Sequence, residues 1–256
     1  MPKQEQDRRK MLKRTRDTYI VSDLHFMHPA ICKYCGRPYK IEGPNSNPAN
    51  KSEVERMNED ILKAFDKLPD SCDVWNLGDV FFPGTTQQTK FLDNPDNVVK
   101  LKEIVERMKG KDRKLFLVLG NHDVFHYKGQ SCLEFYYSLG FDKVYDTPVI
   151  LEDKYILSHE PVYITPGSNF TNLYGHTHDL SIKEDYFTYD YDNYAMITRC
   201  YKQNGEEPPK IEQKWPDKLI NLGNYRNMCL DSSKSILHWV DGIFEKKIKC
   251  WESPQE

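Results

Sequence analysis

Five apolar segments of the chain each end in side chains that can bind metal ions. The polar residues that follow these segments are, in chain order, Asp23 with His25, Asp79, Asn121 with His122 and Asp123, His159, and His176 with His178. Turns use Asp, Asn and Gly readily but have no special need for His. All but one of the eight histidines lie in or beside these segments. Ligands of open α/β sheets bind beyond the carboxyl ends of strands, so we expect these side chains to converge.

The mixture of carboxylate, amide and imidazole groups indicates a transition-metal site. Such a set suits Zn, Mn, Fe or Ni, whereas Mg and Ca prefer shells made of oxygen alone. The set is too large for one tetrahedral ion, but it is sufficient for two ions ~3.5–4 Å apart that share a carboxylate, an arrangement used in phosphoryl chemistry. Glycines precede three of the polar groups, at positions 78, 120 and 175, where the lack of a Cβ keeps a crowded pocket open.

The expected secondary structure alternates between strand and helix in the first half of the chain and is mostly strand in the second half. Helical spacing of apolar residues predicts helices over 52–68, 97–109 and 131–139. Apolar runs predict strands over 19–23, 73–79, 114–120, 143–151, 154–160, 171–178 and 218–224, with a hairpin that turns near 204–205. This order favours a layered α/β sandwich over a purely parallel doubly wound sheet.

Composition limits the class of protein. The 256 residues, 38% of them hydrophobic, allow one domain, which we place over 18–256 after a charged tail over 1–17. That tail is expected to be a solvated end, with an RNA-binding or partner-binding arm as the alternative.

The formal net charge of −3 gives no general basic field for nucleic acid. No apolar run reaches the roughly 20 residues of a membrane helix, and the start of the chain has no secretory h-region, so we expect a cytoplasmic protein without membrane contact. Seven scattered cysteines fit a reducing compartment, and the pair Cys32 and Cys35 is expected to be ordinary thiols.

The five motifs together resemble a known family. D-x-H, G-D, G-N-H-D, a lone His and G-H-x-H, in this order from Asp23 to His178, are similar to the motifs of the calcineurin-like metallophosphoesterases. The stretches "SDLHFMHPAICKYCGRPY" and "NLGNYR" look most like its small phage and bacterial single-domain branch. The resemblance implies an α/β fold built as a four-layer α/β/β/α sandwich with two mostly mixed β-sheets.

The resemblance also implies a ligand set for each of two ions, with one carboxylate shared between them. The first set is Asp23, His25 and His178, and the second set is Asn121, His159 and His176. The shared ligand is Asp79. In such a site, a hydroxide between the two ions has a lowered pKa and attacks the phosphorus atom.

Further roles are expected around the ligands. By the same resemblance, His122 contacts the scissile phosphate and protonates the leaving oxygen. Phe82 stands where many family phosphatases have an acid or Arg, which argues against a protein Ser/Thr phosphatase. His28, Arg37 and Arg226 are candidates for substrate contacts, the alternative being ordinary solvated side chains.

The sequence thus predicts a metal-dependent phosphoric ester hydrolase. Its cofactors are expected to be two divalent transition-metal ions, manganese first, with Fe, Zn or Ni as alternatives. The expected substrate is a phosphodiester or phosphomonoester of a small molecule such as a nucleotide. The alternatives are a DNA or RNA nuclease of the same superfamily and a non-catalytic scaffold on the same fold. The sequence gives no prediction of the oligomeric state.

Overall fold

The computed structural model describes most of the chain. The described residues are 16–39, 51–81, 91–162, 170–176, 178, 227–229, 235–240 and 243–251. The predicted tail except its last two residues, the predicted hairpin near 204–205 and the predicted strand over 218–224 lie outside them.

The larger sheet has six strands with a parallel centre. In spatial order they are β12 (Ile243–Lys249), β11 (Ser235–Val240), β1 (Thr18–Val21), β2 (Asp73–Asn76), β3 (Lys114–Val118) and β6 (Lys143–Tyr145). Strands β1, β2, β3 and β6 are mutually parallel, whereas β11 pairs antiparallel with both β1 and β12. Val21 is in register with Asn76, and Asn76 with Leu117. Strands β1, β2 and β3 therefore end at one edge of the sheet, as the sequence predicted for the polar segments that follow them.

The smaller sheet has four strands and also mixes directions. They are, in spatial order, β10 (Asn227–Cys229), β9 (Thr171–Tyr174), β8 (Tyr155–Leu157) and β7 (Val149–Leu151). Strand β9 is parallel to both β8 and β10, while β7 and β8 form an antiparallel pair. The single strand predicted over 143–151 is in fact two strands, β6 and β7, that belong to different sheets. A separate hairpin joins β4 (His126–Tyr127) to β5 (Gln130–Ser131).

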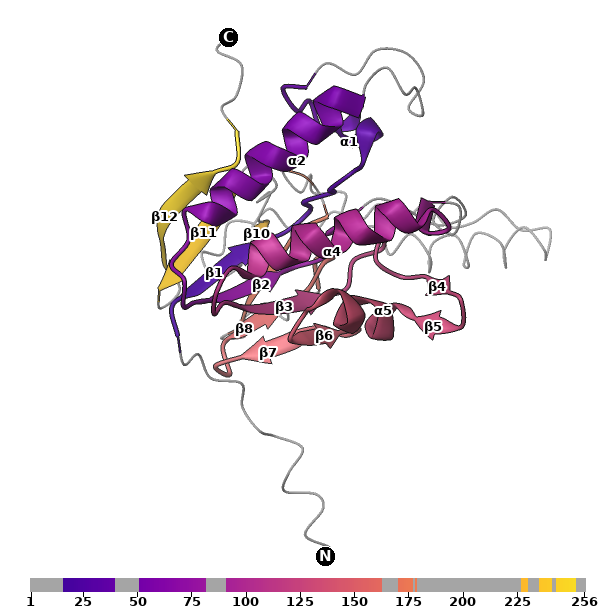
Figure 1. Cartoon of the computed structure of the whole chain (residues 1–256). Helices are drawn as coiled ribbons and strands as arrows, with labels where there is room; N and C mark the ends of the chain where they lie inside the picture. The colour runs from indigo at the N-terminus through magenta and orange to yellow at the C-terminus, as the bar shows by residue number, and fades with distance from the viewer. Residues whose placement is uncertain are drawn as a thin grey trace, which may run out of the picture.

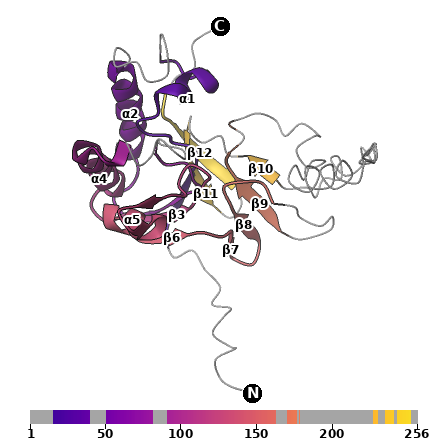
Figure 2. The same ribbon diagram turned by 90° about the vertical axis from the view of Figure 1, so that its right-hand side faces the viewer.

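The two sheets pack face to face over an apolar core (Figure 2). Its buried residues are Ile20, Trp75, Leu77, Val118, Val149, Leu151, Tyr155, Leu157 and Leu173. Trp75 stacks on Phe116 of the neighbouring strand, with ring centroids 4.5 Å apart and planes 12° apart. Because this core interlocks side chains of both sheets, it fixes the end of β8 relative to the end of β1.

Helices cover the opposite face of the six-stranded sheet (Figures 1 and 2). They are α2 (Lys51–Asp66), α4 (Pro95–Lys109) and α5 (Cys132–Leu139), and the short α1 (Pro29–Tyr34) follows β1. The apolar spacing predicted for the first helix is confirmed, because Met57, Ile61 and Phe65 are all buried. Helix α4 starts earlier than the predicted Asn97, because the Asn94 side chain accepts a hydrogen bond from the Asp96 backbone N–H and Pro95 occupies the first turn.

The described residues thus form three layers, helices, sheet and second sheet. An α/β fold with two mixed sheets is as predicted, and the fourth, helical layer stays a prediction, since no helix on the outer face of the smaller sheet is among the described residues. None of the described helices combines the length and apolar character that crossing a membrane requires.

Candidate metal centre

The segments after β1 and β2 continue the sheet past the ends of the strands. The backbone N–H of Asp23 donates to the carbonyl of Gly78 at 2.9 Å, and that of His25 donates to the carbonyl of Asp79 at 2.9 Å. The Leu77 N–H likewise donates to the carbonyl of Val21 at 2.8 Å. These bonds hold the D-x-H segment beside the G-D segment at the carboxyl edge of the sheet.

Hydrogen bonds from the smaller sheet close the same site. The backbone N–H of His176 donates to both carboxylate oxygens of Asp23 at 3.0 Å. The ring Nδ1 of His159 lies 2.8 Å from the carbonyl of Leu77. The Gly175 N–H donates to the carbonyl of His159 at 2.9 Å, so the two histidine segments are tied to each other as well. The side chains that the sequence singled out therefore lie at the seam between the two sheets.

Asp23, His25 and His178 form one cluster of potential ligands. One nitrogen or oxygen from each of the three side chains lies within 4.8 Å of the others. His178 Nε2 is 3.7 Å from Asp23 Oδ1, and the rings of His25 and His178 stack with centroids 5.1 Å apart. The cluster is the set predicted for the first ion.

Asp79, His159 and His176 form a second cluster of the same size. The amide oxygen of Asn121 belongs to it, because it lies 3.0 Å from His159 Nε2 and 3.1 Å from His176 Nδ1. The structure thus brings Asn121, from the loop after β3, to the histidines of the smaller sheet. This group is the set predicted for the second ion together with the predicted shared carboxylate.

Asp79 lies between the two clusters. Its Oδ2 atom is 3.5 Å from His25 Nε2 and 3.4 Å from His159 Nε2. These separations are too long for good hydrogen bonds. They fit two ligands of a common ion, which stand roughly 3.4 Å apart when each is ~2.1 Å from the metal in a tetrahedral shell. The other oxygen, Oδ1, accepts a hydrogen bond from the backbone N–H of His122 at 2.9 Å.

Burial and the contact between Asp79 and His159 together set the protonation of the site. Burial raises the pKa of Asp23 to about 7, with a further contribution from the charge of Asp79. It lowers the pKa of His25 well below its ordinary value and that of His178 to about 4, so both imidazoles are in the neutral, metal-binding form. Burial also opposes charge on His159, but its contact with Asp79 dominates and raises the His159 pKa to about 9. Burial likewise raises the pKa of Asp79, but the contact with His159 outweighs it and holds that pKa below its ordinary value.

The backbone is strained where the predicted ligands lie. Nine non-glycine residues among those described have positive φ. Five of them are predicted ligands: Asp23 (53°), His25 (49°), Asp79 (55°), His176 (66°) and His178 (49°). Each such residue costs on the order of 1–3 kcal/mol, and this strain clusters at functional sites. These five residues lie on three separate segments of the chain, and their side chains gather in the two clusters.

The pocket fits metal ions by two further observations. Both ring nitrogens of His25 and the Nδ1 atom of His178 are buried without a hydrogen-bond partner among the described residues. A Cβ added at Gly120 would overlap the Asp79 carboxylate, and one at Gly175 would overlap the Asp23 carboxylate, which confirms the role predicted for these glycines. Together with the mixed oxygen and nitrogen donors, this arrangement fits divalent transition-metal ions.

Asp123 is the residue whose importance the sequence did not reveal. Its fully buried carboxylate accepts hydrogen bonds from the backbone N–H groups of Asp79 at 2.6 Å, Gly120 at 2.8 Å and Val80 at 3.2 Å, and from the Tyr136 hydroxyl. Burial and the charge of Asp79 raise the pKa of Asp123 to about 6. The sequence marks Asp123 only as the last residue of G-N-H-D. Its hydrogen-bond partners after β2 could not be inferred, because they are 43 and 44 residues away. Asp123 positions the loop after β2 against the loop after β3.

The structure describes two of the three residues predicted to contact substrate. His28 is buried at the site, beside His25 and His122. Arg37 lies behind it, where its guanidinium donates to the carbonyls of Leu24 at 2.9 Å and Asp23 at 2.7 Å and faces the ring of Trp251. These contacts hold the segment that carries Asp23, and the predicted contact of Arg37 with substrate stays a prediction. Arg226 and Phe82 lie outside the described residues.

The chain matches a described protein family and resembles two known proteins. The sequence model of a family described as calcineurin-like phosphoesterase matches residues 17–231. The chain is 30% identical over 110 residues to an uncharacterized protein of Methanocaldococcus jannaschii. That match covers 43% of this chain and 48% of the relative, so the chain spans about half the length of the curated relative it matches. A protein of unknown function from Aquifex aeolicus, of known crystal structure, aligns with a TM-score of 0.39 and 17% identity over 83% of this chain and 88% of its own.

We expect the Asp123→Ala variant to lose stability and metal together. The change leaves three buried backbone N–H groups without an acceptor, at about 1–3 kcal/mol each. Urea unfolding should show a loss of at least ~3 kcal/mol, and metal analysis should show less than one ion per chain. The matched control is Tyr136→Phe, which removes one donor to the same carboxylate and should cost about 1 kcal/mol. Equal stability of the two variants, with full metal content in both, would contradict this role.

Proposed function

The chain belongs to the calcineurin-like phosphoesterase family, as its motifs predicted, and we propose that it hydrolyses phosphate esters with two divalent transition-metal ions. The observation that carries the proposal is the position of Asp79, whose Oδ2 atom faces His25 of one ligand cluster at 3.5 Å and His159 of the other at 3.4 Å. A carboxylate in this position would be a ligand shared by two metal ions. Manganese is the proposed metal, with Fe, Zn or Ni as alternatives, since all accept mixed nitrogen and oxygen ligands.

The ligand residues would make different contributions to binding the two ions. When bound, the ions would act as Lewis acids toward phosphoryl oxygens and would lower the pKa of water. Asp23 and Asp79 supply the negative charge that offsets them, one carboxylate in each cluster. The neutral Asn121 amide completes the second cluster without adding charge. The backbone bonds from His176 to Asp23 and from His122 to Asp79 hold each carboxylate in one orientation.

His122 is the proposed catalytic residue. Its backbone is fixed on Asp79 Oδ1, and its ring stands 5.1 Å from the ring of His25, next to the first cluster. From there an imidazole can donate a hydrogen bond to the scissile phosphate and protonate the leaving oxygen. His122 belongs to neither predicted ligand set, so its removal should affect rate far more than metal binding.

The proposed substrate is a small phosphorylated molecule, a nucleotide among the candidates, bound as a phosphomonoester or a phosphodiester. The net charge of −3 offers no general attraction for a nucleic acid, which disfavours the nuclease alternative. The scaffold alternative is disfavoured because all seven predicted ligands are present and gathered in two clusters. A cytoplasmic location stays a prediction.

Hydrolysis should depend on added metal. Metal-stripped protein is expected to be inactive toward p-nitrophenyl phosphate and bis-p-nitrophenyl phosphate, and activity toward at least one of them should appear as Mn²⁺ is titrated to two equivalents per chain. The rate of p-nitrophenolate release gives the readout, and comparison of the two esters gives the monoester or diester preference. Silence with both esters across Mn²⁺, Fe²⁺, Ni²⁺ and Zn²⁺, in protein that has bound two ions, would count against an enzyme and in favour of a scaffold.

The His122→Ala variant should separate rate from metal content. Loss of a general acid typically costs about 10²–10⁴-fold in turnover, so kcat should fall by that order. Metal analysis should still find two ions per chain. His126→Ala is the matched control, since His126 is an exposed histidine only four residues further on. Normal kcat in the His122 variant would contradict the catalytic assignment.

A further inference from the structure

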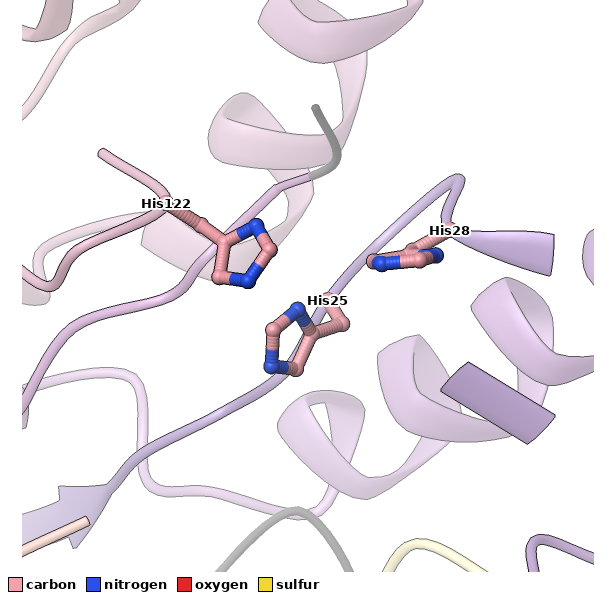
Figure 3. Close-up of side chains that lie close together, drawn as sticks. All are labelled: His25, His28 and His122. Atoms are coloured by element: carbon pink, nitrogen blue, oxygen red, sulfur yellow. The ribbon is translucent and has the colours of Figure 1, made fainter. Parts of the chain in front are cut away.

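A third group of histidines stands beside the two ligand clusters. His25, His28 and His122 each offer a ring nitrogen within 4.8 Å of the others. The ring centroids are 5.4 Å apart for His25 and His28, 5.1 Å for His25 and His122, and 5.8 Å for His28 and His122. Figure 3 shows that the three rings surround a common space, with nitrogen atoms turned toward it. Two of the rings come from the segment after β1 and one from the loop after β3.

His25 faces this space with a nitrogen that needs a partner. Its Nε2 atom is on the side of Asp79 Oδ2, at 3.5 Å, and so serves the first cluster. The other nitrogen, Nδ1, is buried and has no hydrogen-bond partner among the described residues. A histidine that binds metal through one nitrogen carries a proton on the other, and it almost always donates that proton to a carboxylate or carbonyl. Because no described residue supplies an acceptor to this nitrogen of His25, a bound molecule can supply it.

The charge around the three rings favours an anionic oxygen as this acceptor. Each of the two ligand clusters contains a carboxylate, whereas this group contains imidazoles alone. A third cation would have no negative charge to offset it and would lie beside two bound dications. An anionic oxygen would instead be attracted by those ions and could accept from all three imidazole N–H groups.

His28 is held rigidly in this position. Its side chain is buried, only 6% exposed, and its backbone N–H donates to the carbonyl of His25 at 3.1 Å. The preceding residue, Met27, donates its N–H to the Asn58 side chain of α2 at 3.0 Å. His28 then precedes Pro29 and the first turn of α1. A side chain fixed in this way can contact a ligand at little cost in conformational entropy.

We propose that His28 is a substrate-contacting residue, which with His25 and His122 forms a three-imidazole subsite for an oxygen of the substrate's phosphoryl group. This inference rests on the proposed function, and it extends that function by naming His28 and by giving the chemistry of the contact, a hydrogen bond from imidazole to a phosphoryl oxygen. The same oxygen remains on the product, so inorganic phosphate should bind to the subsite as well.

Binding of inorganic phosphate to Mn²⁺-loaded protein, measured by isothermal titration calorimetry, tests the subsite without using activity. His28→Leu keeps apolar bulk but removes the donor, and His28→Ala is a second donor-free variant should the first fail to fold. Either change should weaken phosphate binding about 10–100-fold, the value of one hydrogen bond to a charged acceptor, while metal analysis still finds two ions per chain. His28→Gln offers an amide N–H and should recover most of the affinity. His126→Ala, at an exposed histidine, should bind phosphate as the unaltered protein does.

Two results would overturn the subsite. Unchanged phosphate affinity in the donor-free variants would show that His28 does not contact the anion. Loss of one equivalent of metal in those variants would show that the three imidazoles bind a cation instead. The proposed function fails differently: binding of phosphate that depends on His28, with no hydrolysis of any ester, would support the subsite and contradict the enzyme.

Discussion

The structure depends on the burial of two carboxylates at the seam between its two sheets. Asp23 and Asp79 are 0% and 2% exposed, and a buried carboxylate is costly unless donors or cations surround it. The chain supplies backbone donors from other segments: the N–H of His176 to Asp23 and the N–H of His122 to Asp79. Each bond joins a loop of one strand to the carboxylate after another strand. The same hydrogen bonds thus stabilise the buried carboxylates and hold the two sheets together at the seam. Bound cations would offset the remaining negative charge.

The apolar core explains why the strained loops keep their shape. Positive φ at five predicted ligands is affordable only where the surrounding structure fixes the chain on both sides. Ile20 and Leu157 are fully buried between the sheets just before the loops that carry Asp23 and His159. Asp123 adds a second constraint, because its carboxylate joins the backbones of the loops after β2 and β3. Packing therefore sets where each strand ends, and local bonds set where each side chain points.

The sequence predicted much of this because the site is built from local motifs. Each ligand follows an apolar run, and the parallel strands bring those ends together, so convergence could be inferred without coordinates. The buried face of α2 could likewise be predicted from the spacing of its apolar residues. Long-range facts were not: the positioning roles of Asp123 and Arg37 depend on backbone groups that their own spacing does not reveal. The break between β6 and β7 was hidden because one apolar stretch serves two sheets. The roles of the ligands, and the metals they bind, stay predictions.

Asp79 is proposed to lie between two metal ions. Anomalous diffraction at the manganese edge, from crystals of the protein grown with Mn²⁺, tests this most directly. We expect two anomalous peaks, one on each side of Asp79, the first bounded by Asp23, His25 and His178 and the second by Asn121, His159 and His176. A single peak, or peaks that do not contact Asp79, would contradict it.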